Sequence, residues 1–481
     1  MDKTEEDWKP KPGDRVVRHP RQDDMSPVHL ELPTKRSQSR ALASPLTLLY
    51  SFVGLISLGT ILLSMPFSHH GTGFAPFVEA LFTATSAATV TGLVIQETAT
   101  YWTKAGQMVI LALMFVGGLG FMTIATFLLV LVGQRVTLSQ RLLVRESLGV
   151  NHLGGLVRLT IRIVLVATTI QIIGFVALLA RFLFLDYSVS DSIWHAIFHA
   201  VSGFNNAGFV ALPETNSLSS FQDDRFILGI IGGLILLGAL SYWVMVDVAS
   251  RFNHFSLYSL NSKLVLILTG ILIVSGALVF FFSEFDNERT LGPLPLLDKV
   301  IISVFESISG RTAGFATVSF GDTEQHTNFF FTSLMFVGGA SASVAGGIKV
   351  NTVAVILVAV LSTLRGSPRA TAFGREIPQD QVRRAMTMGA VATTLVFLVA
   401  LTLTFAEREF PFIDLLFESV SAFGTVGLST GLTPDLSRWG HLIIIFSMFI
   451  GRIGPLTLGL AMVQRSQGDL YRYAQERVTI G

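Results

Sequence analysis

The chain has 481 residues, of which 51% are hydrophobic and only 14% are charged, and its formal net charge is +1 at pH 7. Soluble proteins average about 25% charged residues, so the composition excludes an ordinary soluble domain and indicates a protein of the lipid bilayer. There is no cysteine, which excludes disulfides, thiolate metal sites and cysteine nucleophiles. We expect no nucleic-acid partner.

The N-terminal segment, residues 1–44, is not a signal peptide, because it mixes nine Lys/Arg with eight Asp/Glu and lacks an apolar core. We expect it to form a mostly disordered cytoplasmic tail. A membrane-spanning helix needs about 20 mostly apolar residues. The rest of the chain offers eight such stretches, at 45–65, 107–132, 156–185, 226–246, 263–282, 329–360, 391–405 (with a more polar lead-in from 381) and 442–463.

Between the two spans of each pair lies an apolar segment that is too short to cross a bilayer, followed by a loop that contains glycine. Each of these segments carries F-x-x-x-S before the glycine, and four copies at even spacing are a strong repeat signal. The serines are Ser86, Ser202, Ser309 and Ser421, and the glycines are Gly92, Gly208, Gly314 and Gly427. Successive glycines are 116, 106 and 113 positions apart.

The repeat predicts an all-α membrane protein with four M1–pore helix–M2 units around one pseudo-fourfold pore. Eight transmembrane helices and four pore helices would build it. The predicted units are residues 45–132, 156–248, 263–362 and 381–465, followed by a C-terminal tail at 466–481.

The glycine loops are the candidate site. Irregular backbone at membrane depth survives only where it lines a water-filled cavity, and a ring of carbonyls can replace the hydration shell of a cation. One such loop alone is more simply a turn or a packing patch, but four in one frame favour a filter. We expect the glycines to adopt conformations that a Cβ atom would disfavour, and residues 425–427 to be extended. The candidate filter residues are Thr89, Val90, Thr91, Gly92, Asn205, Asn206, Ala207, Gly208, Arg311, Thr312, Ala313, Gly314, Gly424, Thr425, Val426 and Gly427.

The span 329–360 is interrupted by ten small residues, which cannot form a stiff helix. A phosphate-binding loop is excluded because Lys349 follows Ile348 rather than a glycine. A helix-packing patch remains an alternative, but we favour a gate beneath the filter, since a gate needs a flexible element. The interruption consists of Gly338, Gly339, Ala340, Ser341, Ala342, Ser343, Val344, Ala345, Gly346 and Gly347.

Two cations at span depth are further gate candidates, because intramembrane charge is costly and is a functional hypothesis by default. Arg452 lies centrally in its span, where it could form an electrostatic barrier or bind loop carbonyls. Lys349 could act at the gate or extend to the cytoplasmic surface.

Three polar residues occupy the same place in the second, third and fourth short helices: His199, Glu306 and Glu418. They suggest a ring that supports the filter from behind, where either glutamate could neutralise Arg311. His195 and His199 are four residues apart, but HAIFH lacks the glutamate of H-E-x-x-H and has no evident third ligand, so we expect no metal site there.

The links between repeats and their flanks are rich in Lys and Arg, so they and both termini should be cytoplasmic. The opposite loops, at 66–104, 181–225, 284–328 and 407–438, hold 19 acidic and 8 basic residues. An acidic vestibule would concentrate cations at the mouth of a pore.

These motifs resemble those of the superfamily of bacterial and fungal potassium transporters, and most of all the KtrB family, the ion-conducting subunits of Ktr systems. TVTGL around Gly92, FNNAGF at 204–209, GRTAGF at 310–315, FGTVGLS at 423–429 and GGASASVAGGIKVNT at 338–352 carry the match, which covers residues 45 to about 465. The N-terminal tail is longer than the family pattern requires.

The resemblance implies a homodimer with one pore per subunit and potassium uptake that sodium stimulates. It also implies a cytoplasmic regulatory ring of the RCK type, KtrA-like, which would bind ATP or ADP. The chain itself should hold no cofactor, with potassium as substrate. We therefore expect channel-like potassium uptake in the bacterial inner (plasma) membrane, with no enzymatic activity. The alternative is a secondary cation transporter with alternating access, although such folds usually have inverted repeats.

Overall fold

The computed structural model describes residues 45–120, 155–185, 187–213, 217–252 and 254–454, together with Thr123, Thr126, Phe127 and Val130. The predicted tails at 1–44 and 466–481 lie outside the described residues. So do most of the second half of the span 107–132 and the last part of the span 442–463.

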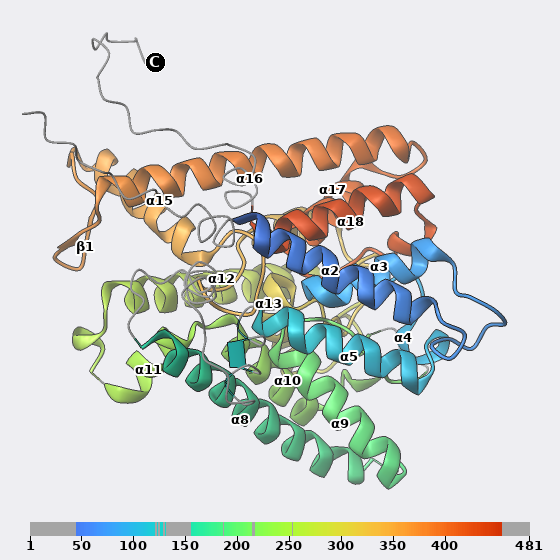
Figure 1. Cartoon of the computed structure of the whole chain (residues 1–481). Coiled ribbons are helices and arrows are strands. Elements are labelled where there is room, and N and C mark those ends of the chain that lie inside the picture. Colours follow the sequence, from blue (N-terminus) through green and yellow to red (C-terminus); the bar gives the residue numbers. More distant parts are fainter. Residues whose placement is uncertain are drawn as a thin grey trace, which may run out of the picture. The chain divides into compact units, whose positions relative to one another are not determined.

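The described part of the chain is mostly helical, as the all-α prediction requires (Figure 1). The helices are α2 (Pro45–Ser64), α3 (Phe77–Thr89), α4 (Thr98–Tyr101), α5 (Lys104–Leu119), α8 (Leu156–Leu183), α9 (Val189–Phe204), α10 (Arg225–Ala239), α11 (Tyr242–Ser250), α12 (Leu260–Glu284), α13 (Leu296–Thr312), α14 (Gln325–Phe336), α15 (Val350–Leu364), α16 (Gln379–Ala406), α17 (Phe412–Gly424) and α18 (Arg438–Ile453). Three short 3₁₀ turns are η2 (Ser219–Phe221), η3 (Phe255–Leu257) and η4 (Thr433–Asp435). Strands β1 (Thr371–Ala372) and β2 (Arg375–Glu376) form an antiparallel hairpin between α15 and α16.

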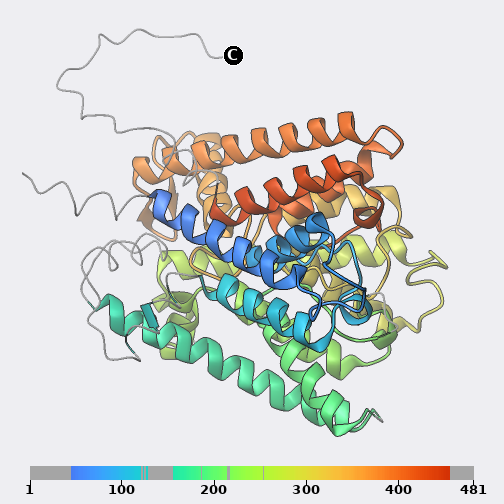
Figure 2. The same ribbon diagram turned by 45° about the vertical axis from the view of Figure 1, so that its right-hand side comes forward.

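Three of the described helices, α8, α12 and α16, are each long and apolar enough to cross a membrane. In both Figure 1 and Figure 2, α16 runs along the top of the bundle and α8 along the bottom. Helices α10 and α11 would pass the same test together, but they are bent by 103°. The predicted span at 226–246 is therefore not one straight helix but is broken between α10 and α11.

The bend has a local cause. Leu240 is extended (φ −82°, ψ 145°), and the hydroxyl of Ser241 accepts a hydrogen bond from the Val244 N–H, which starts a new helix. A serine cap stabilises a helix start because the first turn has unsatisfied N–H groups. Gly238, just before the bend, lies against the Phe204 carbonyl, so α10 ends where it meets α9.

The four short helices α3, α9, α13 and α17 share one design. Three follow a proline (Pro76, Pro295 and Pro411), while Ser188 caps α9. Each has one acidic residue in its first turn, which complements the positive N-terminal end of the helix dipole. These residues are Glu79, Asp191, Asp298 and Asp414.

Each short helix packs between the helix before it and the helix after it: α3 between α2 and α5, α9 between α8 and α10, α13 between α12 and α14, and α17 between α16 and α18. Each helix that follows a glycine loop also contacts the next short helix, in the order α5–α9, α10–α13, α14–α17 and α18–α3. The four groups of helices therefore contact one another in a closed cycle, which brings the four glycine loops together.

Candidate functional site

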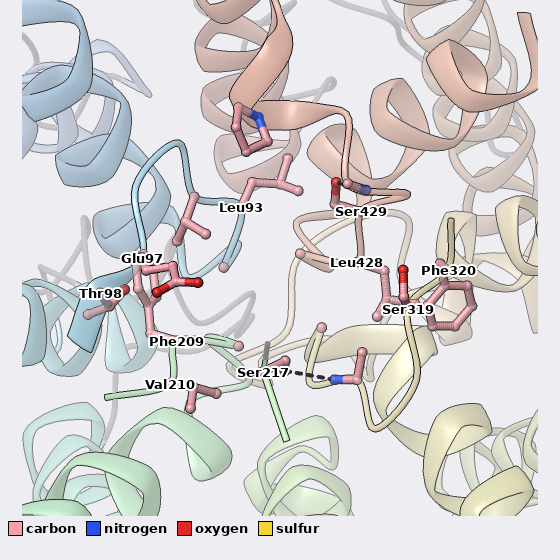
Figure 3. Close-up of a pocket in the computed structure, with 18 of the residues that line it drawn as sticks. Leu93, Glu97, Thr98, Phe209, Val210, Ser217, Ser319, Phe320, Leu428 and Ser429 are labelled. Carbon is pink, nitrogen blue, oxygen red and sulfur yellow. Dashed lines mark hydrogen bonds between the residues drawn. The ribbon is translucent and has the colours of Figure 1, made fainter. Parts of the chain in front are cut away.

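The four glycine loops surround one cavity of about 190 Å³ (Figure 3). Its walls include all four of the predicted glycines, Gly92, Gly208, Gly314 and Gly427. Leu93, Phe209 and Leu428 contribute apolar side chains beside them. Residues more than 300 positions apart in the chain thus meet at one site, which is the convergence that the repeat predicted.

All four glycines have positive φ angles, of 94°, 69°, 76° and 97° in chain order. Glycine adopts such angles without steric cost, so the expectation of a conformation that a Cβ disfavours is confirmed. A Cβ atom on any of them would also come within 3.0 Å of a backbone carbonyl of another loop.

These close approaches form a ring. Gly92 faces the carbonyl oxygen of Ala207, Gly208 that of Ala313, Gly314 that of Val426, and Gly427 that of Thr91. Each carbonyl belongs to the residue that precedes the glycine of the next loop, and the fourth contact returns to the first loop. The backbones are close-packed around a centre, and side chains are excluded from these contacts.

The loops reach this arrangement by unusual backbone conformations. The β-branched residues Val90 and Thr425 have φ angles of 51° and 49°, which are rare for such side chains. Asn206 has a φ of 56°, which asparagine adopts more readily. The prediction that Thr425 is extended is therefore wrong. Its N–H bonds to the Ala422 carbonyl at 3.2 Å, so it ends α17 as a left-handed cap instead. Strain of this kind persists only where the surroundings enforce it.

The four repeated serines hold the loops in two ways. In the first and fourth loops the hydroxyl accepts a hydrogen bond from the filter glycine, Gly92 N–H to Ser86 Oγ at 3.0 Å and Gly427 N–H to Ser421 Oγ at 3.1 Å. In the second and third loops the hydroxyl donates instead to the carbonyl after the glycine, over 2.8 Å for Ser202 and 2.6 Å for Ser309. The F-x-x-x-S repeat is thus explained by the need to anchor each loop to its short helix.

Two buried glutamates hold the chain that follows the glycines. Glu306 Oε1 accepts hydrogen bonds from the N–H and the hydroxyl of Thr317, at 2.6 and 2.7 Å. Glu418 accepts from the hydroxyls of Ser429 and Thr433 and from the Thr430 N–H. Both carboxylates therefore attach the chain that follows each glycine to the short helix before it.

His199 differs from these two glutamates. Its Nδ1 is 2.7 Å from the His195 carbonyl in its own helix, so it makes no hydrogen bond to the following loop through that atom. Among the described residues, no group of three or more His, Cys, Asp or Glu is arranged to hold a metal ion.

Arg311 is fully buried, and its guanidinium lies away from both glutamates. It donates a hydrogen bond to the hydroxyl of Thr269 in α12 at 3.2 Å, and neither Glu306 nor Glu418 forms an ion pair with it. The hypothesis that one of these carboxylates neutralises Arg311 is therefore wrong. The charge of Arg311 therefore lies behind the third loop, next to Thr269. No sequence pattern predicted Thr269 as its partner.

The glycine-rich loop, Gly338–Gly347, lies between the end of α14 at Phe336 and the start of α15 at Val350. Its N–H groups bond to the last carbonyls of α10: Ala340 N–H to Ala239 at 2.9 Å and Val344 N–H to Gly238 at 3.3 Å. On its other side, a Cβ on Gly346 would collide with Thr425 Oγ1, and Gly347 packs against Gly424. The glycine-rich loop therefore packs directly against the fourth glycine loop.

Both candidate cations bind this loop. Arg452 donates to the carbonyl of Val344 and to the carbonyls of Gly117 and Gly118, which end α5. Lys349 Nζ donates to the Ala345 carbonyl, and the residue is half-buried. Of the two roles considered for Arg452, carbonyl binding is the one that the geometry supports.

Sequence reasoning missed one shared feature of the helices that follow the filter loops. Gly117, Gly238 and Gly451 lie against the carbonyls of Ala88, Phe204 and Phe423, near or at the end of the preceding short helix. Each of these glycines is followed by the end of its helix within two residues. The signal was present as a glycine 24 to 30 positions after each filter glycine.

The chain matches the family model for TrkH, described as a cation transport protein, over residues 26–473. It is 39% identical over 437 residues to the Ktr system potassium uptake protein B of Bacillus subtilis (strain 168), covering 91% of this chain and 96% of the relative. It is also 36% identical to the potassium/sodium uptake protein NtpJ of Enterococcus hirae, covering 93% and 99% of the two chains. The protein of the same name, Ktr system potassium uptake protein B, from Vibrio alginolyticus is 36% identical, with coverage of 93% and 97%.

A solved structure shares the fold. The potassium transporter TrkH from Vibrio parahaemolyticus superposes with a TM-score of 0.69 at 18% identity, covering 90% of this chain and 86% of that one. Together with the family match over nearly the whole length, this shows that the chain belongs to the TrkH family of cation transport proteins, which are integral membrane transporters and not enzymes.

Proposed function

We propose that this protein takes up potassium through a filter built from the backbone of its four glycine loops. The observation that carries the proposal is the ring in which each filter glycine faces the carbonyl of the next loop. A ring of carbonyl oxygens replaces the hydration shell of a bare cation. Only glycine is common to the four loops at this position, so the main chain supplies the ligands.

The proposed architecture has four repeated units around one pore, with eight spans and four pore helices. The closed cycle of helix contacts supports it, because the main contacts between units among the described helices join each unit to its neighbours in sequence order and the fourth unit to the first. All four units run in the same direction in the sequence, which favours one central pore over an alternating-access mechanism with inverted repeats.

The glycine-rich loop is proposed as the gate. It contacts the fourth filter segment through Gly346 and Gly347, and it is held by Arg452 and Lys349. A cavity of about 40 Å³ borders Ala342, Ser343 and Val344, so part of the loop has free space beside it. A segment with few packed contacts on one side has the freedom that a two-state element needs.

The proposal for regulation and assembly is based on the relatives of this protein. Relatives named as protein B of a Ktr system support a transporter that works with partner subunits. We extend this to a homodimer that works with a cytoplasmic RCK-type ring, which would bind ATP or ADP. The relative named as a potassium/sodium uptake protein supports stimulation by sodium. The protein would lie in the bacterial inner membrane with both termini in the cytoplasm, since the links between repeats are basic.

The test is potassium uptake by a bacterial strain that lacks its own potassium uptake systems. Expression of the full chain should restore growth at low potassium, and coexpression of a ring subunit should increase the uptake rate. The expected competition series is potassium and rubidium over sodium. Absence of uptake with and without the ring, at normal protein level in the membrane, would reject the proposed function.

A further inference from the structure

One acidic side chain lines the cavity that the four filter glycines share. Glu97 follows Gly92 by five residues and directly precedes α4. Its carboxylate faces the cavity shared by the four loops (Figure 3). Among the described residues that line this cavity, Glu97 is the one with an ionisable side chain.

Several other acids on this side of the described structure have strong partners. Asp191, Asp224 and Asp298 form ion pairs with Lys104, Arg181 and Arg225. Glu284 is buried and accepts hydrogen bonds from the hydroxyls of Thr290 and Thr327, the Asn287 amide and the Glu324 N–H.

Glu97 is held differently from these acids. It accepts one hydrogen bond, from the Thr100 hydroxyl at 3.1 Å, and no cation of the described chain pairs with it. It is also exposed. Its negative charge is therefore uncompensated, and it faces the space above the ring.

The walls of the cavity strengthen the effect of this charge. They include Leu93, Val94, Phe209, Val210, Phe320 and Leu428. A charged group in a cleft with apolar, low-dielectric walls focuses its field into the cleft and raises the local concentration of counter-ions. The cavity, of about 190 Å³, has room for a cation that keeps several of its waters.

We infer that Glu97 forms an outer cation site, where a hydrated monovalent cation is held before it loses water and enters the ring of carbonyls. The inference rests on the proposed function and adds to it the side chain that supplies ions to the filter. One full charge a few ångströms from the ion, in a largely aqueous setting, changes local occupancy by about three- to tenfold.

Replacing the charge tests the site. Glu97→Gln should raise the potassium concentration for half-maximal uptake by about three- to tenfold, while the maximal rate stays within about twofold, and Glu97→Asp should retain most of the affinity. The difference should shrink as ionic strength rises, because salt screens exposed charges. Glu288→Gln is the matched control, since Glu288 is an exposed acid outside the cavity.

A second measurement does not depend on transport. Because the natural chain has no cysteine, Ala99→Cys places one thiol in the wall of this cavity. A cationic methanethiosulfonate should modify it faster than an anionic one, and the added Glu97→Gln change should lower that rate ratio by about three- to tenfold. Added potassium should slow the cationic reagent only when Glu97 is present.

The outcomes are distinct. If Glu97→Gln changes neither the half-maximal potassium concentration nor the rate ratio, the outer site is overturned. If Glu288→Gln has the same effect as Glu97→Gln, the effect comes from the general surface potential and the outer site is likewise overturned. If the unmodified chain transports no potassium, the proposed function fails, while the rate ratio still decides this inference. Should Glu97→Gln not reach the membrane, Glu97→Ser serves as the neutral variant in both measurements.

Discussion

The guanidinium of Arg452 donates a hydrogen bond to the main-chain carbonyl of Val344, which ties the end of α18 to the middle of the glycine-rich loop. The same side chain bonds to the Gly117 and Gly118 carbonyls at the end of α5. These carbonyls would otherwise lack partners, because the last turn of a helix leaves them unsatisfied. Arg452 thus links the fourth repeat, the first repeat and the proposed gate.

The first prediction follows from this link. Hydrogen bonds to a charged donor are worth about 1.5–3 kcal/mol each, so Arg452→Gln should loosen the loop. We expect potassium uptake to rise by several-fold, with an unchanged preference for potassium over sodium. Uptake per molecule, measured against membrane protein level, is the readout. Arg438→Gln is the control, since Arg438 is exposed at the other end of α18.

The opposite pattern would assign Arg452 a structural role. In that case the variant would lose stability strongly, while each remaining molecule would transport at the normal rate. Arg452→Lys adds a second comparison, because lysine keeps the charge but cannot bind carbonyls of two segments with one planar group.

The second prediction concerns the filter glycines. Each has a positive φ and lies against a carbonyl of the neighbouring loop, so a Cβ would be both strained and crowded. Serine at Gly92, Gly208, Gly314 or Gly427 should reduce the preference for potassium over sodium by about tenfold or more, because each kcal/mol or so of lost discrimination changes the ratio severalfold.

The comparison that isolates the filter is Gly233→Ser in α10, where a Cβ would meet no atom within 4 Å. Competition between rubidium and sodium is measured in cells with equal membrane protein level. If all four serine variants compete like the unmodified chain, the glycines do not form the filter.

How much of this site the sequence could predict depends on the range of the interactions. The short helices and their glycines were predictable, since proline, serine and glycine act through the local backbone. The partner of Arg311 was not, because Thr269 is 42 residues away on α12 and the contact is set by packing. The same holds for the close approach of Gly238 in α10 to the Phe204 carbonyl at the end of α9.

Thr425 shows a second limit. β-Branched residues prefer extended backbone, and the local sequence predicted that conformation. In the structure Thr425 is the left-handed cap of α17, with a φ of 49°, and the N–H of Val426 turns back to bond to the Ser421 carbonyl at 2.9 Å. Thr425 packs against Gly346 of the glycine-rich loop and directly precedes Val426, whose carbonyl faces Gly314 in the ring. These tertiary contacts override the local preference of Thr425 for extended backbone. The order of the four loops around the ring was likewise invisible before the contacts of Gly92 and Gly427 were known.

The third prediction concerns Glu418, which accepts hydrogen bonds from Ser429, Thr430 and Thr433. Glu418→Ala leaves these buried donors unsatisfied, at a cost of about 1–3 kcal/mol for each group that finds no water. We expect a lower thermal unfolding temperature of the purified protein and a weaker preference for potassium. Glu418→Gln should recover part of both, because an amide oxygen still accepts from the Thr430 N–H.

Glu409→Ala is the control for this series, since Glu409 is an exposed acid close by in the chain. Its unfolding temperature and its ion preference should stay unchanged. A Glu418→Ala protein with normal stability and normal competition between potassium and sodium would contradict the bracing role of the carboxylate.

The last prediction concerns a deletion within the proposed gate. Deletion of Ala340–Ala345 takes away the two carbonyls of the loop that Arg452 and Lys349 bind, those of Val344 and Ala345. The remaining ends can join, because Gly338 N–H bonds to the Ile348 carbonyl at 2.8 Å and Val350 N–H to the Gly339 carbonyl at 3.0 Å. These two bonds form a stem that does not include the deleted residues. We therefore expect a folded protein in which potassium flux is faster.

Regulation supplies the sharper readout. If the cytoplasmic ring acts by moving this loop, the deletion variant should transport at nearly the same rate with and without the ring subunit. A variant with the six residues replaced by a Gly/Ser segment of equal length is the matched control, because it restores the length of the loop without its side chains. A folded deletion variant that transports no faster than the unmodified chain, and still depends fully on the ring, would place the gate elsewhere. The helix ends at Leu119, Ala239 and Ile453 would then be the next candidates, since the backbone also departs from the helix there.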